Sequence, residues 1–129
     1  MRSSLVVSCG LFALALRASA AEVGGAVEAV EFFNDPMPTP SCHATTIADT
    51  GKGLVAAWFG GAREGAPDVG IWLTRQAGGK WLPAKEVATG VQADGTRHPC
   101  WNPVLFQPKS GPLLLFFKVD IQSRCNVIC

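Results

Sequence analysis

The sequence has little charge, and no run of charge of one sign. Charged residues make up 16% of the 129 residues, and the formal net charge is +1 at pH 7. Nucleic acids and anionic membrane surfaces are bound by clustered Lys and Arg side chains, which neutralise the phosphates. The chain has no such cluster. Its composition therefore argues against a nucleic-acid partner and against an anionic membrane surface.

The chain also lacks two common ligand spacings of structural zinc sites. It contains five cysteines and two histidines, but no Cys-x-x-Cys pair and no His-x-x-x-His pair. Zinc sites are usually built from such closely spaced ligands. We therefore expect no metal, and no other cofactor is indicated.

Only the N-terminus carries a long apolar run, and it has the features of a signal peptide. Arg2 supplies a positive charge, residues 5–16 are apolar but too few to span a bilayer, and Ala18-Ser-Ala20 fits a cleavage site. An uncleaved anchor is the weaker reading, because Arg17 interrupts the run. We predict that residues 1–20 are a signal peptide, that the mature protein has no membrane span, and that it is secreted or stays in the secretory pathway.

Secretion favours disulfide bonds. Loss of Cys9 with the signal peptide leaves Cys42, Cys100, Cys125 and Cys129. An even number of cysteines is compatible with full pairing, and four allow three connectivities.

Short apolar and β-branched runs, separated by Gly, Pro, Asp and Lys, predict antiparallel strands. A first set lies at residues 44–47, 54–59, 69–74 and 81–87. The pattern restarts after Asp94-Gly95 with runs at residues 102–106 and 113–117, and no third run follows. Four strands make one propeller blade. The sequence thus predicts an all-β fold of four-stranded antiparallel blades, of which about one and a half are present.

The turn at residues 74–81 resembles the Asp-box hairpin, Ser/Thr-x-Asp-x-Gly-x-Thr-Trp. Gln76 stands where that motif has Asp, so an amide oxygen is left to accept a backbone hydrogen bond without contributing charge. Gly78 is predicted to take a positive φ, and Trp81 to pack between sheets rather than bind ligand.

Together these residues resemble the sialidase-like (neuraminidase-like) family of six-bladed β-propellers with BNR, or Asp-box, repeats. The other segments that carry the resemblance are residues 40–45, 57–61, Glu64-Gly65, 68–72 and 100–106. It covers residues 33–119, a minority of a full family domain. It implies a lead-in strand at residues 21–33, a partial propeller at 34–119 and an atypical C-terminal tail at 120–129.

The resemblance implies an exo-glycosidase that removes a terminal, acidic sugar from a glycan or glycoconjugate. The alternative is a secreted propeller that has lost catalysis and binds carbohydrate or protein. The family's general acid is an Asp on an early loop, and arginines hold the substrate carboxylate. In the loop at residues 60–68 this points to Asp68 or Glu64 as acid/base and to Arg63 as a substrate ligand. The alternatives are that Asp68 caps the turn and that Glu64 and Arg63 are solvated charges.

The same resemblance gives three further substrate-binding candidates, His43, Arg97 and Asn102. His43 would hydrogen-bond a sugar hydroxyl, Arg97 would hold a carboxylate, and Asn102 would bind beside the aromatic ring of Trp101. Structural roles for each of these side chains stay open. The equivalent positions of Cys42 and Cys100 in neighbouring blades imply a disulfide between them, with burial as small apolar side chains as the alternative.

The sequence departs from the family pattern in two respects. It has no arginine near residues 38–40, where many sialidases carry one, and it contains no tyrosine. Sialidases are exceptional among glycosidases in using a Tyr nucleophile. As written, this chain cannot carry out that double displacement, and we expect it to be inactive by itself.

Overall fold

The computed structural model describes residues 30–33, 35–120 and 124–128, and the chain divides into two compact units, Met1–Val30 and Glu31–Cys129. The predicted signal peptide and most of the predicted lead-in strand lie outside the described residues. Residues 30–33, which are described, form no strand. All regular structure in the described residues is β, and none of them forms a helix able to cross a membrane.

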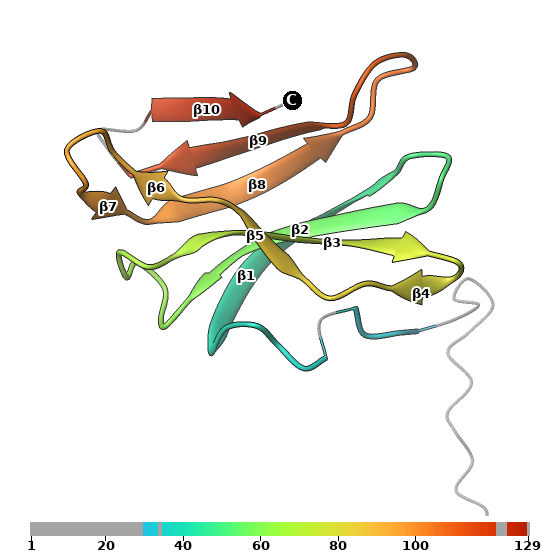
Figure 1. Cartoon of the computed structure of the whole chain (residues 1–129), viewed down its shortest axis with the longest axis horizontal. Coiled ribbons are helices and arrows are strands. Elements are labelled where there is room, and N and C mark those ends of the chain that lie inside the picture. The colour runs from blue at the N-terminus through green and yellow to red at the C-terminus, as the bar shows by residue number, and fades with distance from the viewer. Residues whose placement is uncertain (1–29, 34, 121–123, 129) are drawn as a thin grey trace, which may run out of the picture. The chain divides into compact units, whose positions relative to one another are not determined.

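The first sheet has the four strand positions of a blade (Figure 1). Strands β1 (Ser41–Asp49), β2 (Leu54–Gly61) and β3 (Gly70–Ala77) pair antiparallel in chain order. The fourth position is shared by two short strands, β4 (Lys80–Trp81) and β5 (Lys85–Ala88), which both pair with β3. Pro83 lies between them, where it has no N–H to donate to the β3 backbone. The predicted four-strand unit is confirmed, with its last strand in two pieces.

The second sheet corrects the sequence interpretation, which ended this unit after two strands. Strands β8 (Cys100–Phe106) and β9 (Leu114–Val119) match the predicted pair, but β10 (Arg124–Ile128) continues the sheet on the other side of β9. With only five residues, β10 is too short for a clear alternation of apolar and polar residues in the sequence. The apolar strand β9 is therefore central in the sheet, and its backbone is not an open edge.

A small hairpin connects the two sheets. Strands β6 (Gly90–Val91) and β7 (Arg97–His98) pair across the predicted Asp94-Gly95 turn, where Gly95 has φ of 83°. A Cβ on Gly90 would collide with the backbone carbonyl oxygen of His98, so this close pairing requires glycine.

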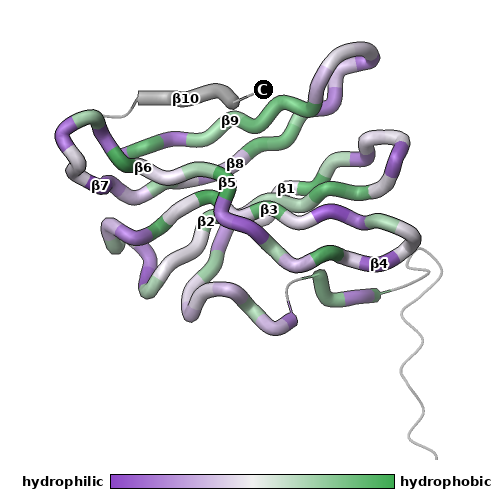
Figure 2. Tube along the Cα trace, in the orientation of Figure 1, coloured by the Kyte–Doolittle hydropathy of each residue, from purple (hydrophilic) through white to green (hydrophobic). Residues whose placement is uncertain are grey.

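The hydrophobic core lies between the two sheets. From the first sheet it takes alternate residues of β2, and Figure 2 shows apolar residues along much of β8 and β9. Alternation puts these side chains on one face of each strand. The core members with the lowest exposure include Ala57, Phe59, Val69, Ile71, Cys100, Phe117 and Val119.

The opposite face of the first sheet is covered by the segment that precedes β1. The ring of Phe33 lies 5.5 Å from that of buried Trp58 and 5.3 Å from that of Trp81. Phe33 therefore lies between the two tryptophans, and the half-buried Trp81 packs against the segment before β1 rather than between two sheets, as its place in the Asp-box-like turn had predicted. Gly78 has φ of 58°, as predicted, but the Gln76 amide donates a hydrogen bond to the Glu31 carboxylate, at 2.9 Å.

Candidate functional site

The predicted site residues gather where β1 and β8 begin, beside the loop between β2 and β3. Ser41, at the start of β1, pairs with Gly61 at the end of β2, and the Cys100 amide donates to the Val69 carbonyl across 3.0 Å. Both strand starts therefore adjoin the two ends of this loop. We call His43, Glu64, Trp101 and Asn102 the rim.

A distorted backbone recurs at the same place in both strands. The pairing of β1 with β2 shifts between His43 and Thr46, and the pairing of β8 with β9 shifts between Trp101 and Val104. Ala44 has φ of 53° and Asn102 has φ of 48°. Left-handed backbone is unfavourable for Ala and tolerated by Asn, and such residues concentrate at functional sites. Bulges redirect nearby side chains, here those of the rim.

His43 and Glu64 approach each other from different elements. The His43 Nε2 atom lies 4.0 Å from Glu64 Oε2 and 3.3 Å from Ser41 Oγ. Both side chains are half exposed, at 50% and 58%. The imidazole ring lies 5.6 Å from that of Phe59, which fixes its position against the core. The structure thus brings together a predicted acid and a predicted substrate ligand, and leaves both open to solvent.

Trp101 connects this pair to a cavity of about 320 Å³. Its ring lies 5.3 Å from Phe59 in an edge-on arrangement, and a Cβ on Gly65 would lie 3.8 Å from the indole. Five residues line the cavity: Trp101, Asn102, Lys118, Val119 and Asp120. It therefore offers an aromatic ring, an amide, an ammonium and a carboxylate to one ligand.

Asp68 holds the loop closed at its base. One carboxylate oxygen accepts a hydrogen bond from the Ala62 amide across 2.9 Å. This is the turn-capping geometry that the sequence left open for Asp68. Arg63 and Glu64, both exposed, lie between these two anchor points.

Arg97 is engaged by the protein itself. Its NH2 group lies 2.6 Å from Glu86 Oε1 and donates to the Asp68 carbonyl oxygen across 2.8 Å. Its Nε atom is buried and has no hydrogen-bond partner among the described residues. Arg97 thus joins β7 to β5 and to the base of the loop. Because NH2 is already engaged and Nε is buried, Arg97 is a poorer ligand for a substrate carboxylate than an exposed cation.

The structure contradicts the disulfide between Cys42 and Cys100. Cys100 is a free, fully buried thiol in the core, whereas the Cys42 sulfur lies 3.7 Å from that of Met37. The strand alternation explains the separation. His43 faces the core side, over Phe59, so its neighbour Cys42 points to the other face of β1. Equivalent backbone positions therefore place these two side chains apart.

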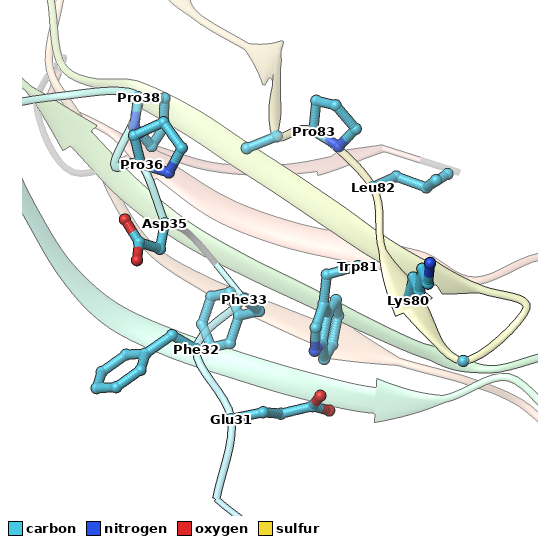
Figure 3. A pocket seen from close by; sticks show the side chains of 12 residues that line it. Glu31, Phe32, Phe33, Asp35, Pro36, Pro38, Lys80, Trp81, Leu82 and Pro83 are labelled. Carbon is cyan, nitrogen blue, oxygen red and sulfur yellow. The ribbon is translucent and has the colours of Figure 1, made fainter.

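The part of the chain that the structure describes contains no group of three His, Cys, Asp or Glu side chains able to hold a metal ion. A second cavity, of about 550 Å³, lies between the segment before β1 and the Asp-box-like turn, and none of the rim residues lines it. Figure 3 shows Phe33 and Trp81 side by side in it, with the carboxylates of Glu31 and Asp35 nearby.

Sequence reasoning missed Lys118, Asp120 and Glu86. Lys118 had a visible signal, since it is an isolated charge in an apolar strand. Asp120 was assigned to the C-terminal tail, and its place beside Trp101 follows only from the pairing of β8 with β9. Glu86 meets Arg97 through tertiary contact, which no local pattern predicts.

Residues 52–125, more than half of the chain, match the family model of the BNR repeat-like domain. The chain therefore belongs to the BNR repeat-like family, whose repeats occur in sialidase-like propellers. The resemblance and the fold class inferred from the sequence, partial β-propeller blades, are both confirmed. No curated protein and no solved structure shows significant similarity to the chain.

Proposed function

We propose that the rim binds the terminal sugar of a glycan or glycoconjugate, as part of a sialidase-like propeller in the secretory pathway or outside the cell. The observation that carries this proposal is the convergence of His43, Glu64, Trp101 and Asn102 on one exposed edge beside a cavity. Sugar sites combine an aromatic surface with a few well-placed polar groups. The recurrent left-handed backbone at Ala44 and Asn102 supports a functional rather than a packing role.

Each group has a distinct part in this proposal. Trp101 packs against the apolar face of the sugar ring, and Asn102 and His43 hydrogen-bond its hydroxyl groups. An acidic sugar also needs a cation for its carboxylate. Lys118 lines the cavity and Arg63 lies on the exposed loop, so both are better placed for that role than Arg97, which is paired with Glu86.

Glu64 is the better candidate for the acid/base of a hydrolytic reaction. Its carboxylate reaches His43, while that of Asp68 is used to hold the Ala62 amide. A general acid must reach the leaving-group oxygen, which favours the exposed, rim-facing group. Asp68 then acts as a positioning residue for the loop.

The composition of the chain favours recognition over hydrolysis. It contains no tyrosine, so the nucleophile of sialidase chemistry is missing from it. Exo-glycosidase activity of the sialidase type therefore requires a nucleophile that this chain does not contain. Sugar binding without cleavage is the function that the residues of this chain support.

The proposal is tested by titrating the ¹⁵N-labelled mature chain with N-acetylneuraminic acid and with galactose, followed by NMR. We expect shifts in the Trp101 indole and Asn102 amide signals, larger for the acidic sugar. Asn102→Gly keeps the left-handed backbone but removes the amide, and should weaken binding about tenfold, the effect of roughly one hydrogen bond. Val91→Ala, in β6, is the control and should bind as the parent does. Shifts that avoid the rim, or none with either sugar, would contradict the proposal.

A further inference from the structure

The described residues include two exposed apolar surfaces. One lies on β8, where Val104 and Phe106 are each 54% exposed. The other belongs to the first sheet and its covering segment, where Ile47 is 53% exposed and Phe32 is 82% exposed. Val104 pairs with Phe116, and Ile47 pairs with Ala56. We call the Val104, Phe106 and Phe116 surface the front face, and the Ile47 and Phe32 surface the back face.

The pairing registers show which face of the first sheet corresponds to the front face. The bulges align His43 with Trp101, so Thr46 corresponds to Val104 and its partner Ala57 corresponds to Phe116. In the first sheet these positions are covered by the second sheet. Ala57 is fully buried, and the Thr46 hydroxyl accepts a hydrogen bond from the Leu105 amide across 3.3 Å. The front face therefore repeats a surface that is already buried under a sheet, with larger apolar residues at these two positions and with Lys118 where the first sheet has Phe59.

The back face corresponds to the side of the second sheet that packs on the first. Leu105 packs into the core against the first sheet and is only 8% exposed. Its counterpart in β1, one residue after Thr46, is Ile47, which is exposed on the opposite face of the first sheet. The surface around Ile47 therefore corresponds to the face of the second sheet that packs on the first sheet. Phe33 covers Trp58 further along this face, while Phe32 beside it points outward into solvent.

We propose that the front face of one copy of this chain packs on the back face of the next, repeating between chains the contact that its own two sheets make. The contact is head to tail, so it closes into a ring when the rotation per chain allows. Counting only the two blade-like sheets that the structure describes in each chain, three copies give six, within the range of natural propellers. Ring closure brings the rims of the copies around one axis, so the sugar site is completed by neighbouring chains.

Sedimentation equilibrium of the mature chain over a concentration series tests this assembly. We expect a mass about three times that of one chain. Val104→Lys places a charge in the front face, and Ile47→Lys places a charge in the back face. Each variant alone should therefore be monomeric. Because each keeps the face that the other lacks, an equimolar mixture should form a one-to-one dimer. Val91→Lys, also an exposed valine but on neither face, should assemble as the parent does.

A monomeric parent chain would overturn the proposal. So would a mixture of the two variants that stays monomeric, since a head-to-tail contact must restore one interface. Circular dichroism checks that each variant keeps its sheets. If Val104→Lys does not, Val104→Thr, which installs the residue found at the equivalent Thr46, replaces it and should weaken assembly at least tenfold. Unchanged assembly in a folded front-face variant would also contradict the proposal.

Discussion

Burial changes the chemistry of Cys100. The thiol lies in the core between the two sheets, and the cost of burying the thiolate raises its pKa from 9.0 to about 11. The positive charge of Arg97 acts in the opposite direction but is the weaker influence. Two pKa units correspond to about a hundredfold less thiolate at neutral pH. The residue behaves as a small apolar side chain, which was the alternative to the disulfide.

We therefore predict that Cys100 resists alkylation in the folded protein. Iodoacetamide at pH 8 should label it at least a hundredfold more slowly before unfolding than after, as measured by peptide mass spectrometry. Rapid labelling in the native state would show that the core is open at this point.

The same pKa shift gives a pH dependence of stability. The folded state holds the Cys100 proton above the pH at which the unfolded chain releases it, so unfolding is favoured as the pH rises from 9.0 to about 11. In denaturant unfolding, the free energy of unfolding of the parent should fall over this pH range, and that of Cys100→Ala should not fall for this reason. Equal slopes against pH in the two proteins would contradict the assignment.

At the scale of elements, the strands were largely predictable and the bulges were not. Alternation and turn residues predicted strands close to the observed β1, β2, β3, β8 and β9. The left-handed backbone at Ala44 could not be predicted from the residue type, because its φ is imposed by the pairing of β1 with β2. The ion pair of Arg97 with Glu86 likewise depends on tertiary packing. The site residues could therefore be nominated from the sequence, but not their mutual contacts.

The loop between β2 and β3 gives a prediction at this scale. Asp68→Ala removes the acceptor for the Ala62 amide and should destabilise the closed loop by about 1 kcal/mol. Hydrogen exchange of the Ala62 amide should rise roughly fivefold as a result. Glu64→Ala, in the same loop but half exposed and 4.0 Å from its partner, is the matched control and should leave that exchange rate unchanged. Equal effects of the two variants would show that Asp68 does not anchor the loop.

At the scale of the whole molecule, stability depends on covering the exposed sheet faces. Propeller blades bury much of their surface against their neighbours, so an isolated pair of sheets keeps fewer of the contacts that offset conformational entropy than a closed ring does. We expect monomeric protein, including the two face variants, to unfold in a broad transition. If copies associate as proposed, the midpoint of thermal unfolding should rise with protein concentration. A sharp transition independent of concentration would contradict both expectations.

Export is a further prediction for the whole chain. Residues 1–20 have the pattern of a cleavable signal peptide, so protein from a secretory host should begin near Ala21 or Glu22. Intact-mass analysis of the secreted protein checks this. Intracellular protein that retains Met1 would contradict secretion.

Recognition of a terminal sugar at the rim, without cleavage, is the function proposed for this chain. A single NMR experiment addresses both parts, by recording saturation transfer from the mature protein to an aryl α-sialoside while following the sialoside signals over time. We expect transfer to the sugar protons with no release of free sugar above the rate in buffer. Absence of transfer would contradict recognition, and release of free sugar would contradict the inference drawn from the missing tyrosine.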